Sequence, residues 1–269
     1  MQKNWGKTKM SYGKHLAFNR DGRIGVITLD NAKGFNLVGS DFLKELEEIQ
    51  KEITADGDLG AIVINAKGDN FSAGIDLKFL KEVSSEFIMA NLVWLQNLYS
   101  FWQDLPIPVI AAINGLCYGS ATELILGCDI RIAADDAKFS IPEVRFGLAP
   151  DMGGTTRLTH LVGIGQAKRL ILGCEAIDAE EALRIGLVEI LVKKEDLNQR
   201  AMKLAKKMAA FPPSGVRFAK KGINLANESG VQAGLLFEQS QSTFCCGTED
   251  LREAVTAFLE KRKPVFKGR

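Results

Sequence analysis

The chain has 269 residues, enough for one large domain or for a domain with an appendage. Hydrophobic residues make up 46% of it and charged residues 25%, which is ordinary for a globular protein with a sizeable core. The formal net charge of +1 gives no electrostatic reason to expect nucleic acid or an anionic membrane as a partner.

The first residues and the cysteines indicate where the protein works. Residues Met1 to Lys14 are polar and lack the apolar run of a signal peptide, and no stretch approaches the ~20 apolar residues of a membrane span. The five cysteines include no CxxC pair, which favours reduced thiols in a cytoplasm. The only histidines are His15 and His160, so a zinc site is not expected. We therefore expect a cytoplasmic protein without a metal.

Residues 1–195 alternate short apolar runs with helical patterns. The apolar runs predict buried strands, and apolar residues recurring every three or four positions predict helices. Strands are expected at 24–29, 61–64, 106–113, 130–133 and 138–141, and helices from Ser40 to Ile53, across 84–104 and from Ser120. This strand–strand–helix rhythm, with glycine turns after strands, predicts an α/β core.

The composition changes after residue 195. From 197 to 261 the pattern is almost wholly helical, with interruptions at Gly230 and Gly247. We therefore divide the chain into a core, 1–195, and a C-terminal helical region, 196–269. Such a helical block either covers its own core or packs on a neighbouring subunit.

Two turns of small residues can present backbone amides to a ligand. Ser72-Ala73-Gly74 follows a strand and a polar loop, and Gly119-Ser120-Ala121 follows a strand and opens a helix. Small residues let a ligand approach the backbone, and the free N–H groups at a helix start carry a favourable dipole. The N–H groups of Ala73 and Ser120 could hold one carbonyl oxygen and stabilise negative charge that develops on it. Taken singly, each turn is a common structural feature.

Three acids stand beside glycine-rich turns: Glu123, Glu143 and Asp151. Carboxylates brought together in a dry pocket can hold a water molecule or pass a proton. Structural alternatives exist for each acid. Glu123 could lie on a helix surface, Glu143 could cap the following turn, and Asp151 could cap a helix that begins near Gly153.

An aromatic stretch precedes these turns. Trp94, Leu98, Tyr99 and Trp102 recur near helical spacing, which predicts a core face or the lining of an apolar pocket.

The turns and acids together resemble the crotonase, or enoyl-CoA hydratase/isomerase, superfamily, over nearly the whole chain. The residues that carry the resemblance are Phe71 to Leu77, Pro108 to Glu123, Cys128 to Arg131, Pro142-Glu143, Gly147-Leu148, Gly153 to Thr155, Gly173, Ala179 to Ala182, Gly186 to Val188 and Phe258 to Pro264. The resemblance implies a spiral of β-β-α turns with a C-terminal helical region that assembles trimers or dimers of trimers.

The resemblance also implies an acyl-CoA thioester as substrate. Its thioester oxygen would lie between the amides of Ala73 and Ser120, although the family more usually has glycine at the second position. The implied contacts to coenzyme A are Ala73, Asp76, Leu77 and, reaching a neighbouring subunit, Phe258 and Lys261. No separate cofactor is implied, because coenzyme A is part of the substrate.

Glu123 and Glu143 align with the two glutamates that hydratases of this superfamily use. In such enzymes the pair holds one water over the double bond. One carboxylate takes a proton as the oxygen attacks Cβ, and the acidic partner delivers a proton to Cα. Our first hypothesis is therefore a hydratase acting on a 2-enoyl-CoA.

Asp151 leaves an alternative open. Plain hydratases usually carry a small residue there, whereas dienoyl-CoA isomerases place an aspartate at this offset. Those isomerases, however, tend to have aspartate where this chain has Glu123. The second hypothesis is a double-bond isomerase that uses Glu143 and Asp151 as proton shuttles. A third, a CoA-binding scaffold or an RNA-binding relative, is disfavoured by the near-neutral charge and the intact acid pair.

Overall fold

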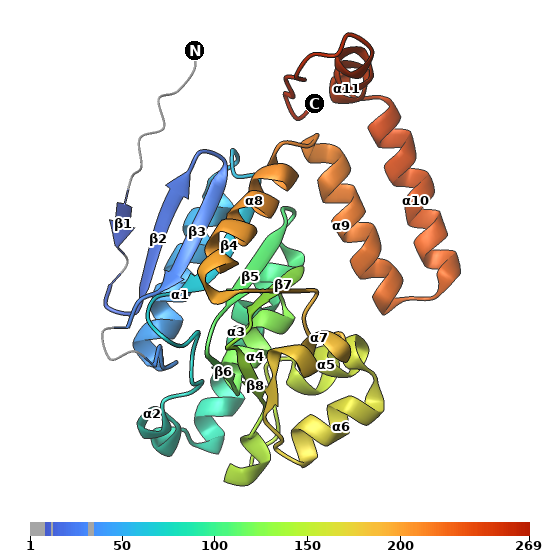
Figure 1. Cartoon of the computed structure of the whole chain (residues 1–269). Helices are drawn as coiled ribbons and strands as arrows, with labels where there is room; N and C mark the ends of the chain where they lie inside the picture. Colours follow the sequence, from blue (N-terminus) through green and yellow to red (C-terminus); the bar gives the residue numbers. More distant parts are fainter. Residues whose placement is uncertain (1–8, 12, 32–34) are drawn as a thin grey trace.

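The computed structural model describes residues 9–11, 13–31 and 35–269, which form two β-sheets with helices around them (Figure 1). The seven-stranded sheet has the order β1 (Lys9–Ser11), β2 (Leu16–Asp21), β3 (Ile24–Leu29), β4 (Ala61–Ala66), β5 (Val109–Ile113), β7 (Ile130–Ala134) and β10 (Ile190–Val192). The three-stranded sheet has the order β6 (Leu116–Tyr118), β8 (Lys138–Ser140) and β9 (Ile177–Asp178). Pairing in the large sheet is antiparallel from β1 to β3 and parallel from β3 to β10.

Helices form at the predicted positions, and further helices lie at 77–82, 164–172 and 179–184, where none was predicted. They are α1 (Ser40–Ala55), α2 (Leu77–Glu82), α3 (Ser85–Asp104), α4 (Ser120–Leu126), α5 (Gly154–Val162), α6 (Ile164–Leu172), α7 (Ala179–Arg184), α8 (Leu197–Ala209), α9 (Pro213–Glu228), α10 (Val231–Cys246) and α11 (Glu249–Leu259), with short 3₁₀ helices at Glu143–Phe146 and Lys194–Asp196. The predicted strand 106–113 begins only at Val109. Pro106 and Pro108 explain the difference, because proline has no N–H to give to a ladder.

The chain winds between the two sheets, which confirms the predicted β-β-α spiral. β5 lies in the large sheet, β6 in the small sheet, and α4 completes one turn. The next turn repeats the path with β7 and β8. The segment at Ser72 also joins the small layer, since it forms an isolated parallel bridge with Cys117 of β6.

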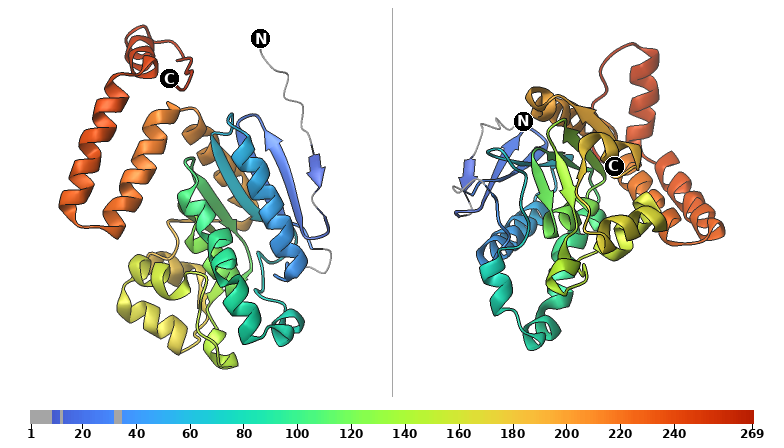
Figure 2. Two further views of the ribbon diagram at one scale, coloured as in Figure 1. Left: turned by 180° about the vertical axis from the view of Figure 1, so that it is seen from behind. Right: turned by 60° about the horizontal axis from the view of Figure 1, so that its bottom comes forward.

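The large sheet is buried on both faces. Along β4, Ile62 and Ile64 belong to the core cluster under α1 and α3, whereas Ala61 and Val63 belong to the cluster under α8. Successive side chains of a strand point to opposite faces, so a strand covered on both sides reads as a continuous apolar run. Figure 1 shows α8 lying across one face of the sheet, and Figure 2 shows α1 and α3 across the other.

Helix α8 lies close to the sheet because its buried stripe is made of small residues. Ala201, Ala205 and Ala209 recur every four residues and are all buried. The approach is tight, since a Cβ atom built on Gly60 would lie 2.8 Å from the Cβ of Ala209. α8 therefore packs with the core although it follows residue 195. The division into 1–195 and 196–269 as domains stays a prediction.

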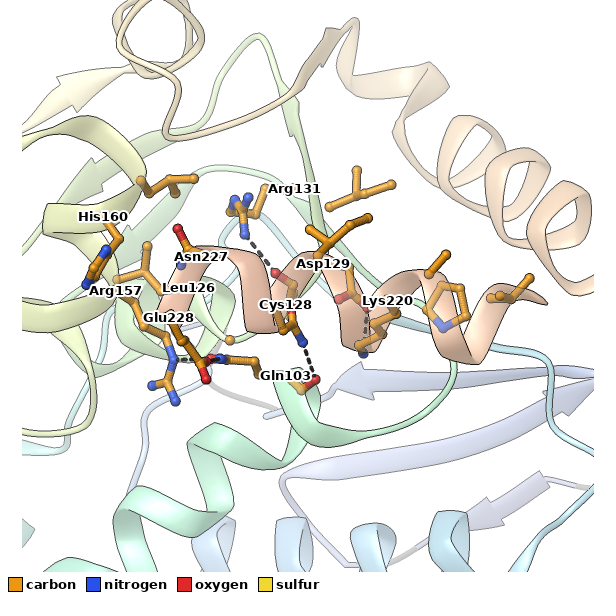
Figure 3. Close-up of a pocket in the computed structure, with 18 of the residues that line it drawn as sticks. Gln103, Leu126, Cys128, Asp129, Arg131, Arg157, His160, Lys220, Asn227 and Glu228 are labelled. Carbon is orange, nitrogen blue, oxygen red and sulfur yellow. Dashed lines mark hydrogen bonds and ion pairs between the residues drawn. The ribbon is translucent and has the colours of Figure 1, made fainter. Parts of the chain in front are cut away.

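We call α9, α10 and α11 the C-terminal arm, residues 213–259. The arm is tied to the core through Lys220 of α9, whose side chain is only 9% exposed. Its ammonium group donates to the carbonyl oxygens of Trp102 at 2.8 Å and Ile107 at 3.0 Å, and it pairs with Asp129 at 2.7 Å (Figure 3). α10 and α11 project away from the sheets in Figure 1.

Large apolar side chains remain exposed along the arm. Those at least 45% exposed are Ile223, Val231, Leu235, Leu236, Phe244, Val255, Phe258 and Leu259. Exposed apolar side chains gathered on one set of helices are typical of an interaction surface. Within the described part of the chain, all five cysteines are free, as expected, and no helix is both long and apolar enough to cross a bilayer.

Candidate active site

Glu123 is buried at the first turn of α4. The helix begins at Ser120, after Gly119 adopts φ +55°, a conformation that L side chains rarely adopt. The Glu123 residue is only 1% exposed, and its Oε1 accepts the N–H groups of Met152 at 3.0 Å and Gly154 at 2.9 Å. A helix-surface role for Glu123 is therefore wrong.

Glu143 lies beside the start of the same helix. A Cβ atom built on Gly119 would lie 2.8 Å from Oε1 of Glu143. The other oxygen, Oε2, is buried and has no hydrogen-bond partner among the described residues. Glu143 is the first residue of a 3₁₀ turn. The N-cap of this turn is Pro142, and no side-chain cap hydrogen bond is made there, so the structure gives no support to a capping role for Glu143.

Both carboxyl groups have raised pKa values, and the charge of Glu143 acts on Glu123. Burial raises the pKa of Glu123 to about 7, and the negative charge of Glu143 adds to the effect, while the amides of Gly154 and Met152 oppose it. Burial also raises the pKa of Glu143. Two neighbouring acids with raised pKa values can share one proton near neutral pH.

Asp151 lies on the loop before α5 and keeps contact with solvent. Its charge raises the pKa of both Glu143 and Glu123, which places its carboxyl group near the pair. The predicted helix begins at Gly154, and its N-cap, Gly153, makes no side-chain cap bond. The capping alternative for Asp151 therefore finds no support. The loop is held by Gln96, which donates to the carbonyl oxygen of Asp151 at 2.9 Å.

The first turn of small residues needs a correction. The N–H of Ala73 donates to the carbonyl oxygen of Phe35 at 2.9 Å, so it is engaged within the protein rather than open to a ligand. The next amide, of Gly74, donates to Oγ of Ser72 at 3.1 Å. The amide of Ile75 has no hydrogen-bond partner among the described residues.

Alternation along an extended segment explains the difference. Ile75 forms an isolated parallel bridge with Val38, in which the N–H of Val38 donates to Gly74 and the N–H of Asp76 donates to Val38. Successive N–H groups of an extended segment point to opposite sides, so the amide of Ile75 faces away from Val38. The sequence showed the small turn but could not show which of its amides the Phe35 and Val38 segments would occupy.

The second turn lies directly against the first. Gly74 has φ +89°, and a Cβ atom built on it would lie 2.5 Å from the carbonyl oxygen of Tyr118 and 3.6 Å from the amide nitrogen of Ser120. Only glycine fits at this contact. The amide of Ser120 opens α4 and has no partner within the helix. The structure therefore brings the free amides of Ile75 and Ser120 to adjacent segments, next to Glu143.

The predicted coenzyme A contacts fall into two groups. Asp76 caps α2 by accepting the N–H of Lys78 at 2.8 Å, and the neighbouring Leu77 is 55% exposed, both beside the first turn. Phe258, which is 83% exposed, and Lys261 lie on and just after α11, far from α2 in Figure 1. Within one chain, Phe258 and Lys261 are therefore not brought beside Asp76 and Leu77.

Tyr99 is a neighbour of the acids that the sequence placed in an aromatic stretch and not among the site residues. It lies on α3, is fully buried, and has a phenol whose pKa is raised by burial and then by the charge of Glu123. Asp151 and Glu143 raise it further. Only the aromatic spacing of α3 signalled this residue, and that spacing predicts packing rather than a polar site.

A separate cavity of about 780 Å³ lies between α9 and the core (Figure 3). Its walls include Lys220, Asp129 and Arg157, and none of the predicted site residues. Arg157 supports the site from a distance, since it donates to the carbonyl oxygen of Met152 at 3.2 Å and so braces the loop that holds Glu123. Within the described ranges, no three His, Cys, Asp or Glu side chains are arranged to hold a metal ion.

Comparison with known proteins identifies the family of the chain. Residues 19–269 match the family model described as enoyl-CoA hydratase/isomerase. The chain is 38% identical over 250 residues to the short-chain-enoyl-CoA hydratase of Clostridium acetobutylicum, covering 93% of this chain and 96% of that protein. It is 34% identical over 258 residues to the crotonyl-CoA hydratase of Syntrophomonas wolfei, covering 96% and 99%.

A solved structure supports the same assignment. The fold matches the crystal structure of an enoyl-CoA hydratase from Bacillus anthracis with a TM-score of 0.90 at 33% identity, covering 95% of this chain and all of that one. Family model, relatives and fold together indicate an enzyme of the hydratase/isomerase type. The chain therefore belongs to the enoyl-CoA hydratase/isomerase family, the crotonase superfamily that its turns and acids resemble.

Proposed function

We propose that the protein adds water across the 2,3 double bond of a 2-enoyl-CoA thioester. The observation that carries this proposal is the burial of Glu123 beside Glu143, with a pKa of about 7 for Glu123. A carboxyl group with such a pKa can act as acid or base at neutral pH. The hydratase names of the relatives support the same reaction.

The thioester oxygen would bind between the amides of Ile75 and Ser120. These two N–H groups lack partners among the described residues and lie on adjoining segments. Amides fixed in place need no rearrangement when negative charge develops on the oxygen, and each such donor typically lowers the barrier by about 2.7–4 kcal/mol. We assign the first position to Ile75 instead of Ala73 because the amide of Ala73 is already used by Phe35.

The acid pair would supply and remove one proton each. Oε1 of Glu123 is fixed by two amides, which leaves its other oxygen for a water molecule, and Oε2 of Glu143 has no hydrogen-bond partner in the part of the chain that the structure describes. A water held there gives its proton to the ionised carboxylate as its oxygen attacks Cβ. The protonated carboxyl group then delivers its proton to Cα, so the pair ends with the same single proton. This chemistry uses only side chains and amides of the chain.

Replacing either acid should remove most of the activity. Glu123→Gln and Glu143→Gln should each lower kcat for hydration of crotonyl-CoA by about 10²–10⁴-fold, because each removes a group that moves a proton in the transition state. The double variant should be little worse than the singles, since the two act as a unit. Loss of absorbance of the conjugated thioester measures the rate. The exposed Glu180→Gln is the matched control, and equal rates in control and site variants would contradict the proposal.

The rate should also depend on pH in a bell shape. The raised pKa of Glu123, about 7, means that the pair loses its shared proton as the pH rises through that value, so kcat/KM should fall on the alkaline side. On the acid side kcat/KM should fall as the second carboxyl group becomes protonated, above the ordinary glutamate value because burial raises the pKa of Glu143. A flat profile from roughly pH 5 to 9 would refute the shared proton.

Double-bond isomerisation is the second candidate, and the position of Asp151 favours it. The Asp151 carboxylate raises the pKa of Glu143, so these two acids can take a proton from Cα and deliver one to a carbon further along the unsaturated acyl chain. The catalytic acids would then be Glu143 and Asp151, with Glu123 as a bystander.

The variant Asp151→Asn separates the two candidates. Under the hydratase proposal it should keep hydration of crotonyl-CoA, because the carboxylates of Glu123 and Glu143 remain. If the protein is an isomerase, solvent deuterium should enter a 3-enoyl- or 3,5-dienoyl-CoA without any hydroxyl product, and Asp151→Asn should abolish that exchange. Mass spectrometry in heavy water records both outcomes, and deuterium entry without hydration in the wild type would overturn the hydratase proposal.

We further propose that the C-terminal arm assembles a trimer or a dimer of trimers. The exposed apolar side chains of the arm support this, because a second copy would cover them. Assembly would also explain Phe258 and Lys261. They lie on and just after α11, which Figure 1 shows on the other side of the molecule from α2, and they could reach the coenzyme A of a neighbouring subunit.

Light scattering should give a mass of about three or six times the chain mass of 29.4 kDa. Leu236 is 65% exposed on the arm. Leu236→Glu would bury a charge in the interface, so this variant should shift the measured mass toward that of the monomer. Gln232→Glu, on the same helix, is the control and should leave the assembly intact. A monomeric wild type would rule the assembly out.

A further inference from the structure

The loop that holds Glu123 is itself held from its other side. The peptide group between Asp151 and Met152 donates its N–H to Glu123 at 3.0 Å, and its carbonyl oxygen accepts a hydrogen bond from Gln96 at 2.9 Å. The N–H and C=O of a trans peptide point in opposite directions, so the bond from Gln96 sets the direction of this N–H. Gln96 belongs to α3, and the helix therefore reaches the acid through the loop.

Arg157 fixes the next peptide group of the same loop. Its Nη1 donates to the carbonyl oxygen of Met152 at 3.2 Å, its Nη2 to the hydroxyl of Ser100 at 2.7 Å, and its Nε to Oε1 of Gln103 at 2.8 Å. The guanidinium lies so close to the backbone that a Cβ atom built on Gly153 would overlap with Nη1. Because a guanidinium presents its donors in a fixed plane, this one side chain ties the loop to α3.

The side chains that hold the loop share one face of α3. Gln96, Ser100 and Gln103 follow one another at intervals of four and three residues, which places them on one stripe of a helix. The stripe runs to the end of α3 at Asp104, where the last carbonyl groups of a helix have no partner within it. The position of the loop therefore depends on what fixes this end of α3.

Helix α9 of the C-terminal arm fixes the end of α3. Lys220 donates to the carbonyl oxygen of Trp102 at 2.8 Å, and the side-chain amide of Asn224 donates to that of Gln103 at 3.0 Å. The carboxylate of Glu228 accepts the side-chain N–H of Gln103 at 2.6 Å, beside Arg157 in Figure 3. The three residues of α9 recur every fourth position, so one stripe of the arm meets α3.

We propose that α9 positions the acid Glu123, with Gln103 and Arg157 as the positioning residues that connect them. The path runs from α9 to the end of α3, through Arg157 to the loop, and through the loop amides to Oε1 of Glu123. The inference rests on the proposed role of Glu123 and adds a control of that role by the arm. Because the arm is also the proposed assembly surface, a subunit with a displaced arm should hold its acid less firmly.

Gln103→Met tests the path without changing a charge. The variant keeps a side chain of similar length but loses its hydrogen bonds to Arg157 and to the arm, while the charges of Glu143 and Asp151 that act on Glu123 remain. If the loop loosens, its two amides withdraw from the carboxylate. These amides lower the pKa of Glu123, so that pKa should rise.

Two measurements record the change. Carboxyl titration by carbon-13 NMR should place the Glu123 pKa in Gln103→Met about half a pH unit or more above that of the wild type, as weakening of one hydrogen bond would give. The kcat for crotonyl-CoA should fall about tenfold with KM within about twofold, because the acid is misplaced while the thioester contacts remain. Gln199→Met, exposed on α8, is the matched control and should keep all three values.

Two further variants locate the effect along the path. Ser100→Ala removes the acceptor of Nη2 of Arg157 without touching the arm, so it should raise the same pKa, and it serves if Gln103→Met does not fold. The double variant Asn224→Ala/Glu228→Ala breaks the path at α9. Loss of a negative charge alone would lower the pKa of a nearby acid, so a rise in the double variant reports a movement of the loop.

The outcomes separate this inference from the hydratase proposal. A Glu123 pKa that stays at the wild-type value in both Gln103→Met and Ser100→Ala would overturn the positioning path, even if kcat fell, because a merely structural role predicts that result. Wild-type values in the double variant of α9 would overturn the link to the arm. The NMR titration needs no turnover, so the expected rise in a protein that hydrates no 2-enoyl-CoA would retain the path and refute the reaction.

Discussion

The site depends on one interaction, the capture of a buried carboxylate by two backbone amides. Oε1 of Glu123 accepts from Met152 and Gly154, which approach from a loop about thirty residues further along the chain. Without those bonds a carboxyl group only 1% exposed would be costly to ionise. With them it remains a usable acid or base, and its second oxygen is left for chemistry. Arg157 braces the same loop through the carbonyl oxygen of Met152.

Patterns within one segment predicted most of the fold. The continuous apolar run of β4 and the spacing of α1 follow from burial on known faces, so strands and helices appear where the periodicity puts them. The glycine turns could also be predicted, because Gly74 and Gly119 adopt positive φ at close contacts, where only glycine fits. The position of α8 was harder to predict. A helix after a change of composition looks like an appendage until its alanine stripe is seen against the sheet.

What the sequence could not show arises from contacts between distant segments. The N–H of Ala73 donates to the carbonyl oxygen of Phe35. The N–H of Ile75 has no partner among the described residues, because Val38 bonds to Gly74 and Asp76 on the opposite side of the segment. Tyr99 of α3 meets the end of α4, where a Cβ atom built on Gly127 would lie 2.5 Å from the carbonyl oxygen of Tyr99. The effect of the charges of Glu123 and Asp151 on the pKa of its phenol cannot be predicted from the sequence around Tyr99. The alternative capping roles of Glu143 and Asp151 could likewise be tested only in the structure, where neither following helix has a side-chain cap hydrogen bond.

The proposed reaction requires that Glu123 and Glu143 share one proton near neutral pH. A carboxyl titration by carbon-13 NMR tests it directly, with Glu123→Gln to assign the signal. We expect one glutamate with a pKa of about 7 in the wild type, and a lower pKa for the same group in Glu143→Gln, because the neighbouring charge is gone. A Glu123 signal that titrates at the ordinary glutamate value in both proteins would contradict it.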